Sequence, residues 1–191
     1  MIKSVYKPAE DSFLLNLYVE KEAKGIILDM GTGNGIQAIT AALNPKVNKV
    51  IAIDINPKAI EEAKNNAHTH NCSEKIDFLL GNLFLPLRRY EFDLIIFNPP
   101  YLPADPRESV DNETNALVGG ITVAEVIKKF LKEAKYYLKF NGKILLILSS
   151  LTNIILSEMD KDYQIEILDK KQIFFEKIFC LSIKKRIRFK K

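Results

Sequence analysis

The chain contains no tryptophan and only two cysteines, Cys72 and Cys180. The cysteines lie far apart and form no Cys-x-x-Cys pair, and the two histidines, His68 and His70, are expected on a solvated helix face. This spacing favours neither a disulfide framework nor a zinc site. We therefore expect a protein without a disulfide and without a bound metal.

Long apolar runs are also missing. None approaches the roughly 20 residues needed to span a bilayer, and no extended apolar segment follows Lys3 near the N-terminus. This pattern predicts neither a membrane anchor nor a signal peptide, and the cytoplasm is the expected compartment. With 191 residues, 47% of them hydrophobic and 27% charged, residues 1–191 are expected to form a single domain with a sizeable core.

Excess positive charge is absent from most of the chain, although the formal net charge is +4. Six lysines and arginines fall in the last eight residues, 184–191, and the remainder carries a net charge of −2. A body of this charge argues against a basic nucleic-acid-binding surface, so specific DNA binding is not expected. We interpret the basic tail as protection for the edge of the last strand, and an RNA contact is the less favoured alternative.

Apolar runs of strand length alternate with helical patterns along the chain, which predicts an α/β fold with a parallel, doubly wound sheet. Helices are expected at 11–24, 34–43, 57–70 and 121–138, and strands at 25–30, 49–54, 75–80, 94–97 and 143–149. Asn141-Gly142 is expected to form a turn before residue 143. A short helix and an antiparallel pair, 163–168 and 173–187, are expected to close the chain. The long irregular segment 102–120 is interpreted as functional.

A glycine-rich turn follows the first expected strand, where Asp29 is followed by Gly31, Gly33 and Gly35. Glycines let a ligand approach the backbone closely at a helix N-terminus. A dinucleotide-binding turn has the spacing G-x-G-x-x-G and would place its third glycine at Ile36. The spacing G-x-G-x-G after an acid instead resembles the first motif of class I S-adenosylmethionine-dependent methyltransferases. Glycines that serve only a tight turn are the less favoured alternative.

Two further strand ends carry residues suited to a nucleoside. Asp54 lies about 20 residues beyond the glycines, where an acid can accept hydrogen bonds from both ribose hydroxyls. NAD and S-adenosylmethionine would both use such an acid, so Asp54 alone does not choose between them. After the third strand, Asn82 and Leu83 occupy the place where class I methyltransferases hold adenine. Asn82 departs from the acid common there, which predicts weakened donor binding.

The residues Asn98-Pro99-Pro100-Tyr101 follow the fourth expected strand and indicate the kind of group that the site would bind. A residue before proline is held extended, and Asn98 offers a side-chain carbonyl at the strand end. Carbonyls placed there can accept both hydrogens of a planar –NH2 group. Amide nitrogens and exocyclic base nitrogens are both planar and weakly nucleophilic, so both need positioning before alkylation. A simple strand-terminating turn is the alternative for these four residues taken alone.

Three motifs together resemble the HemK/PrmC family of protein glutamine N5-methyltransferases. They are the glycine turn, Asn98-Pro99-Pro100-Tyr101, and the opening segment that contains Pro8-Ala9-Glu10-Asp11-Ser12. Asn-Ala-Leu-Val-Gly-Gly at 115–120 and Phe174-Phe175-Glu176 on the expected closing strands extend the resemblance over nearly the whole chain. The opening segment is most similar to the archaeal and eukaryotic branch, which modifies the Gly-Gly-Gln glutamine of class I release factors.

The resemblance implies a Rossmann-like class I methyltransferase fold, with a seven-stranded, mostly parallel sheet, helices on both faces and an antiparallel closing strand. Residues 1–24 would form a helical cap over the donor, and 102–120 a substrate loop. S-adenosylmethionine is the implied donor, without a metal. The implied catalytic residues are Asn98, Pro99, Pro100 and Tyr101, and the implied donor-binding residues are Glu10, Ser12, Asp29, Gly31, Gly33, Gly35, Asp54, Asn82, Leu83 and Asn98.

The resemblance also implies partners. A class I release factor is the expected substrate, and few residues precede Asp29, so short loops or a partner are expected to recognise it. A small zinc-binding activator that adds a strand to the sheet edge is a second candidate, with residues 76–80 as the edge. Three alternatives stay open: a nucleic-acid N-methyltransferase acting on adenine N6 or guanine N2, a degenerate fold kept for binding, and a nicotinamide oxidoreductase.

Overall fold

The computed structural model describes residues 5–88, 90–99, 123–152 and 162–186. The strands are β1 Gly25–Met30, β2 Val47–Asp54, β3 Ile76–Leu80, β4 Phe92–Phe97, β5 Leu138–Ser149, β6 Tyr163–Ile173 and β7 Glu176–Lys185. The helices are α1 Glu10–Glu22, α2 Ile36–Leu43, α3 Pro57–Thr69 and α5 Val123–Ala134, and a short 3-10 turn, η1 Ser73–Lys75, precedes β3. None of the helices in these ranges is both long and apolar enough to cross a membrane.

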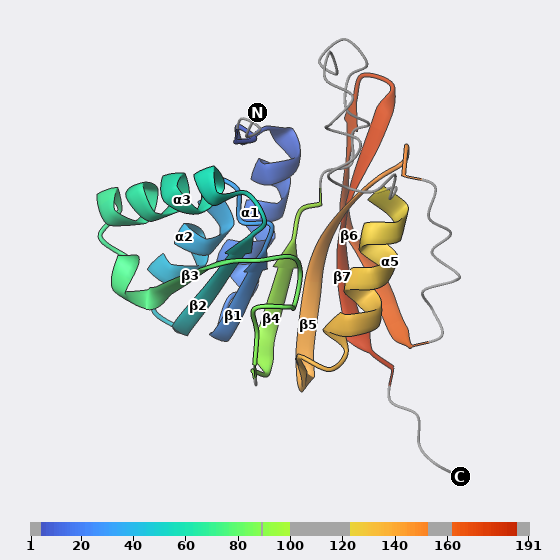
Figure 1. The fold of residues 1–191 in the computed structure, drawn as a ribbon. Coiled ribbons are helices and arrows are strands. Elements are labelled where there is room, and N and C mark those ends of the chain that lie inside the picture. The colour runs from blue at the N-terminus through green and yellow to red at the C-terminus, as the bar shows by residue number, and fades with distance from the viewer. Residues whose placement is uncertain (1–4, 89, 100–122, 153–161, 187–191) are drawn as a thin grey trace.

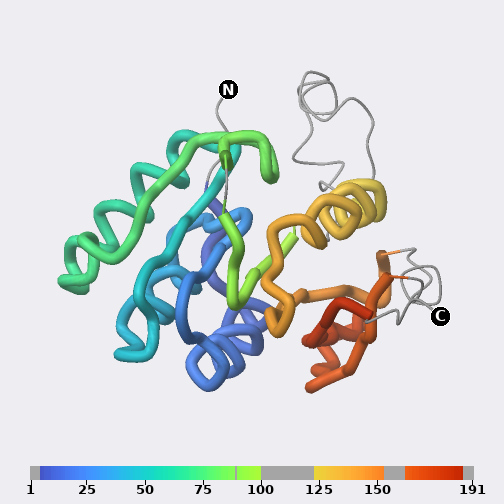
Figure 2. Tube along the Cα trace, turned by 90° about the horizontal axis from the view of Figure 1, so that it is seen from below, coloured from blue at the N-terminus to red at the C-terminus, as the bar shows by residue number. Residues whose placement is uncertain are grey.

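The strands form one seven-stranded sheet with the order β3-β2-β1-β4-β5-β7-β6 (Figure 1). Neighbours among β1 to β5 are parallel, whereas β7 runs antiparallel to both β5 and β6. This arrangement confirms the predicted Rossmann-like α/β architecture. In Figure 2 the first half of the chain, blue to green, occupies one side of the molecule, and the orange to red segments occupy the other.

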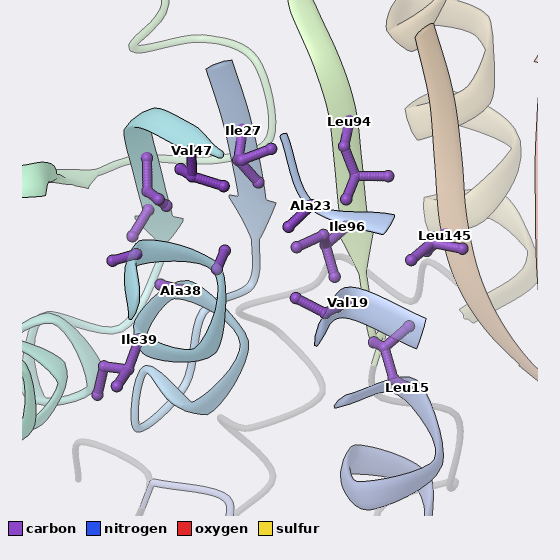
Figure 3. Close-up of a cluster of buried hydrophobic side chains, with 14 of the residues drawn as sticks. Leu15, Val19, Ala23, Ile27, Ala38, Ile39, Val47, Leu94, Ile96 and Leu145 are labelled. Carbon is purple, nitrogen blue, oxygen red and sulfur yellow. The ribbon is translucent and has the colours of Figure 1, made fainter. Parts of the chain in front are cut away.

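Side chains of the central strands alternate between two apolar layers, as the period of a strand requires. Ile27 and Ile96 lie in one buried cluster with residues of α1 and α2, whereas Leu28 and Ile95 lie in the other with residues of α5. Figure 3 shows the first cluster, in which side chains of α1 and α2 meet those of β1, β4 and β5. Helices therefore cover both faces of the sheet, as predicted.

The register brings the carboxyl ends of three strands together. Met30, the last residue of β1, lies opposite Ile53 of β2 and Phe97 of β4. Gly31 and Asn98 follow these strands directly, so they lie at the same edge of the sheet as the end of β2. We call this the carboxyl edge, and doubly wound α/β folds bind their ligands there.

Several helix ends differ from the prediction. α1 ends at Glu22, because Ala23 is already extended, with ψ of 124°. α2 begins at Ile36, because the left-handed Gly35 occupies its N-cap position. α5 ends at Ala134 and does not reach residue 138, which begins β5.

One turn prediction is wrong. Asn141-Gly142 lies inside β5, which begins at Leu138 and not at Lys143. A Cβ at Gly142 would lie 2.7 Å from the carbonyl oxygen of Phe92, so glycine permits the close approach of β4. The β4–β5 register also shifts between Phe92 and Leu94, so the dipeptide lies in an irregular part of β5 and not in a turn before it.

β6 and β7 form a hairpin with the turn Phe174-Phe175, which confirms the predicted antiparallel pair. β6 is longer than predicted, and it includes Ile173, which was expected to begin the second strand. Phe174 has φ of 50°, and the two phenylalanines are 91% and 100% exposed, so they lie in the turn and not on the strands.

Several predictions fall outside the described residues. These are the positions of Pro100 and Tyr101, the substrate segment 102–120, and most of the stretch between β5 and β6 where a short helix is expected.

Candidate active site

The glycine loop, residues 31–35, leads from β1 into α2. Gly31, Gly33 and Gly35 all have left-handed backbones, with φ of 66°, 55° and 89°. A Cβ at Gly35 would lie 3.0 Å from the Cβ of Ala63, so this glycine permits close packing of the loop on α3. A Cβ at Gly33 would meet no atom within 4 Å, so the space beside it is open. The loop can therefore hold a ligand close to its backbone near the N-terminus of α2.

Asp29 lies beneath the glycine loop and is only 2% exposed. Its Oδ2 accepts hydrogen bonds from Thr32 Oγ1 at 2.6 Å and from the Ala38 backbone N–H at 3.1 Å. Burial raises the pKa of the Asp29 carboxyl to about 7, because the opposing effect of these two hydrogen bonds is smaller and the charge of Asp54 adds to the rise. The contacts of Asp29 tie the loop to α2.

Asp54 closes β2 beside the glycine loop. Its Oδ2 accepts a hydrogen bond from the Gly33 backbone N–H at 2.9 Å, and its Oδ1 accepts one from the Asn56 backbone N–H at 2.9 Å. A carboxylate offers about four lone-pair sites, so acceptor capacity remains for the hydroxyl groups of a ligand. The structure thus brings Asp54 directly against the loop.

The turn after β3 lies next to Asp54, whose backbone carbonyl accepts a hydrogen bond from the first residue of that turn at 2.9 Å. Asn82 is exposed, whereas Leu83 is buried with φ of 49°, an uncommon value for a residue other than glycine. The following residue, Phe84, is buried and stacks on Phe130 with ring centroids 5.5 Å apart. This packing holds Asn82 and Leu83 beside the end of β2.

Asn98 follows β4 and is held from α1. Its Nδ2 donates to Asp11 Oδ2 at 2.6 Å and lies 3.4 Å from Ser12 Oγ. Its Oδ1 is buried and has no hydrogen-bond partner within the part of the chain that the structure describes. Buried carbonyl groups in folded proteins nearly always have a hydrogen-bond donor, so this oxygen has the capacity to accept a hydrogen bond from a ligand.

The other predicted residues of α1 and the Asn-Pro-Pro-Tyr motif take different positions. Ser12 is buried, and its backbone carbonyl accepts a hydrogen bond from Gln37 Nε2 at 2.8 Å, which joins α1 to α2. Glu10 is exposed and forms an ion pair with Lys171 of β6. Pro99 is buried directly after Asn98.

Asp11 is a site residue that the sequence did not identify, since the roles in its motif were assigned to Glu10 and Ser12. It is 1% exposed, and its Oδ1 accepts a hydrogen bond from the Tyr6 hydroxyl at 3.0 Å. A signal was present, because Asp11 lies four residues before the buried Leu15 and therefore on the apolar face of the helix. An acid on such a face requires a polar partner.

Comparisons with known proteins identify the family of the chain. A family model described as "methyltransferase small domain" matches residues 9–165. A Methanocaldococcus jannaschii protein provisionally named a protein N5-glutamine methyltransferase is 34% identical over 182 residues, which cover 93% of this chain and 90% of that protein.

Two bacterial relatives match over a shorter part of their own length. The release factor glutamine methyltransferase of Aquifex aeolicus is 30% identical over 133 residues, which cover 67% of this chain and 47% of that protein. The ribosomal protein uL3 glutamine methyltransferase of Bradyrhizobium diazoefficiens is 34% identical over 124 residues, with coverage of 62% and 39%. The chain thus spans less than half of each bacterial relative.

Solved structures show the same fold. A ribosomal protein L11 methylase of Lactobacillus delbrueckii subsp. bulgaricus superposes with a TM-score of 0.68 at 20% identity, over 95% of this chain and 82% of that one. A tRNA m1G37 methyltransferase of M. jannaschii gives a TM-score of 0.67 at 21% identity, over 98% and 53%. At this level of identity the likeness concerns the fold alone, because one fold serves many substrates.

Proposed function

The chain belongs to the methyltransferase small-domain family, as one of its HemK/PrmC-type members, and from this we propose that it methylates the side-chain amide nitrogen of a protein glutamine. The donor is S-adenosylmethionine. The substrate we propose is the glutamine of the Gly-Gly-Gln loop of a class I release factor.

One observation carries the proposal: the buried side-chain oxygen of Asn98 lacks a hydrogen-bond donor within the described ranges. A primary amide has two N–H groups in one plane, and this oxygen can accept one of them. The backbone carbonyl of Pro99, one residue further along, is the acceptor that we assign to the second. An acceptor pair of this kind suits an –NH2 group and not a hydroxyl or a thiol.

Holding both amide hydrogens addresses the weak nucleophilicity of the nitrogen. Its lone pair is delocalised into the carbonyl, so the reaction depends on orientation. Aligning a nucleophile with its electrophile at contact distance can contribute about 7–11 kcal/mol to lowering the barrier. The nitrogen becomes more acidic as its new bond to carbon forms, so a weak acceptor is sufficient to take the proton. Asn98 and Pro99 therefore act by positioning, and no strong general base is required.

The residues beside Asn98 fit the donor. When bound, S-adenosylmethionine supplies an electrophilic methyl group on a positively charged sulfur. The open space at Gly33 can receive the part of S-adenosylmethionine that lies against the loop backbone. The Asp54 carboxylate has lone pairs left for the ribose hydroxyls of the same molecule. Asn82 and Leu83, next to Asp54, are the residues we assign to the adenine.

The relatives support a protein as the acceptor. Two of them are named for glutamine methylation of a release factor and of ribosomal protein uL3. Both named substrates carry a glutamine amide, which matches the acceptor geometry at Asn98. The release factor is our choice between them because of the similarity of residues 8–12 to the archaeal and eukaryotic branch.

β3 is the edge strand next to β2, so its outer side offers backbone groups for pairing with another chain. We propose this edge as the docking strand of a small activator protein. A preparation of the isolated chain that is monomeric and fully active on the release factor would contradict this part of the proposal.

The proposed substrate can be tested by methyl transfer from radiolabelled S-adenosylmethionine. The acceptors are the cognate release factor, its loop variant with alanine in place of the glutamine, ribosomal protein uL3, and duplex DNA. We expect label on the unmodified release factor and none on the alanine variant.

Other labelling results would lead to different conclusions about the substrate. Label on uL3 alone would retain glutamine methylation and replace the substrate. Label on DNA alone would favour a nucleic-acid N-methyltransferase, which uses the same –NH2 geometry. If no acceptor is labelled although the donor binds, repeating the assay with the candidate activator added decides whether the isolated chain is incomplete.

A further inference from the structure

The orientation of the Asn98 amide is set by its surroundings. Its Nδ2 lies 2.6 Å from Asp11 Oδ2. A carboxylate can only accept hydrogen bonds, so the reversed amide would place two oxygen atoms against each other at that distance. The amide nitrogen must therefore face Asp11, and the oxygen must face the other way.

Asp11 is itself held firmly. It is 1% exposed in the first turn of α1. The Tyr6 hydroxyl donates to Oδ1 at 3.0 Å, and Ser12 Oγ lies 3.5 Å from Oδ2 on the side of Asn98. Since Ser12 Oγ also lies 3.4 Å from Asn98 Nδ2, both groups near the nitrogen are able to accept its hydrogens.

We propose that Asp11 is a positioning residue for methyl transfer, because its carboxylate selects the rotamer of Asn98 that presents Oδ1 to the acceptor –NH2 group. The inference rests on the proposed function of Asn98 as an acceptor of the substrate amide. For this role, the side chain at position 11 must be unable to donate a hydrogen bond to Asn98.

Two other roles for Asp11 predict different behaviour. A purely structural tie between α1 and β4 would make Asp11 substitutions lower the Tm, and kcat would fall only as far as the folded fraction falls. A direct role in binding the positively charged donor would raise the donor Kd and leave the rate at saturating donor unchanged.

The informative substitution is Asp11→Asn, which keeps the size of the side chain but adds a donor. Its Nδ2 can bond to Asn98 Oδ1 and so stabilise the unproductive orientation. A hydrogen bond to an ionised group is roughly twice as strong as a neutral one, so we expect kcat to fall about tenfold in Asp11→Asn. The donor Kd and the Tm are expected to stay close to wild type. The matched control is Glu20→Gln, which makes the same charge change at an exposed position of α1.

A double-mutant cycle tests whether Asp11 acts through Asn98. In an Asn98→Ala background, Asp11→Asn should cause no further loss of kcat. An equal loss in both backgrounds, or a raised donor Kd with unchanged kcat, would overturn the inference.

A measurement without turnover separates this inference from the proposed function. The side-chain NH2 signals of Asn98, identified by their loss in Asn98→Ala, can be followed by ¹H–¹⁵N NMR. We expect one strongly downfield proton in the wild type, which moves upfield in Asp11→Asn and stays in place in Glu20→Gln. A wild-type protein that shows this signal but methylates no glutamine would refute the proposed function alone, and the absence of the signal would refute the role of Asp11.

Discussion

The carboxyl edge of the sheet has two sides that satisfy their polar groups in opposite ways. One side is the side that we propose for S-adenosylmethionine, called the donor side and formed by the glycine loop, Asp29 and Asp54. Both carboxylates there accept hydrogen bonds from the protein's own groups. On the side that we propose for the substrate amide, called the acceptor side and formed by Asp11 and Asn98, the amide nitrogen of Asn98 is held by Asp11. Its amide oxygen is buried and has no hydrogen-bond partner among the residues that the structure describes. The protein's own groups thus pair the carboxylates of the donor side, whereas the acceptor side presents a buried oxygen to which a substrate can donate a hydrogen bond.

This difference has a physical consequence. The protein stabilises the donor loop through internal hydrogen bonds whether or not a ligand is present. The oxygen of Asn98 has no partner within the described ranges, and a buried polar group without a partner costs free energy that a substrate supplying a hydrogen-bond donor would recover. Substitutions on the two sides should therefore separate donor binding from turnover.

The largest expected effect is that of Asn98→Ala. Loss of one well-placed catalytic hydrogen-bonding group costs about 10²–10³ in rate, so kcat for the release factor should fall by that factor, with little change in donor affinity. Single-turnover kinetics and calorimetric titration measure the two quantities. Asn65→Ala, at an exposed position of α3, is the matched control. Wild-type turnover in Asn98→Ala would contradict the proposed role of Asn98 in positioning the substrate amide.

Asp54→Ala should show the reverse pattern. Hydrogen bonds to charged groups contribute about 1.5–3 kcal/mol, so the donor Kd should rise by about 10- to 100-fold, while kcat at saturating donor changes little. Calorimetric titration with S-adenosylmethionine gives the Kd. The Tm must be recorded as well, because Asp54 also supports the Gly33 and Asn56 backbone groups. A loss confined to kcat would contradict the division into two sides.

Substitutions at Gly33 and Gly35 separate stability from donor binding within the glycine loop. Gly35→Ala adds a Cβ 3.0 Å from that of Ala63 at φ of 89°, whereas Gly33→Ala adds one in open space at φ of 55°. Overpacking typically costs about 1–3 kcal/mol, so Gly35→Ala should be less stable than Gly33→Ala by that amount. Gly33→Ala should instead weaken donor binding more than stability. Chemical denaturation and donor titration of both variants provide the test, and equal unfolding free energies would refute it.

The smallest expected effect concerns the pH dependence of Asp29. Burial is the main cause that raises the folded-state pKa of the Asp29 carboxyl to about 7, from an ordinary value of 3.8. The folded protein therefore holds a proton that the unfolded chain has released, and stability falls as pH rises toward and through 7. One pKa unit corresponds to about 1.4 kcal/mol, so the unfolding free energy should drop by about that amount between roughly pH 6 and pH 8.

Asp29→Asn isolates this contribution. An asparagine oxygen can still accept hydrogen bonds from Thr32 and Ala38, but the side chain no longer titrates. The variant should therefore show a flatter stability profile between roughly pH 6 and pH 8 than the wild type. Identical slopes in denaturation experiments would mean that Asp29 stays ionised throughout this range.

The sequence was sufficient for the parts of the fold that follow from local pattern. Alternating apolar runs predicted the parallel strands, and the G-x-G-x-G spacing predicted the loop whose glycines are all left-handed. Asn56-Pro57 predicted the start of α3, where Asn56 caps the Lys58 backbone N–H. These features depend on residues close together in the chain, so a short window contains the necessary information.

The tertiary structure decided what depends on residues far apart. Gly142 lies inside β5, where the Phe92 carbonyl of β4 approaches it closely, and no local signal distinguishes that from a turn. Asp11 belongs to the site because its partner, Asn98, lies 87 positions further along the chain. The sequence by itself determined the fold class and the glycine loop, and it predicted Asn98 as the residue that accepts the substrate amide. Only the packing of α1 against the end of β4 determined which way the Asn98 amide faces, because the carboxylate of Asp11, from a distant segment, cannot donate a hydrogen bond to the Asn98 oxygen.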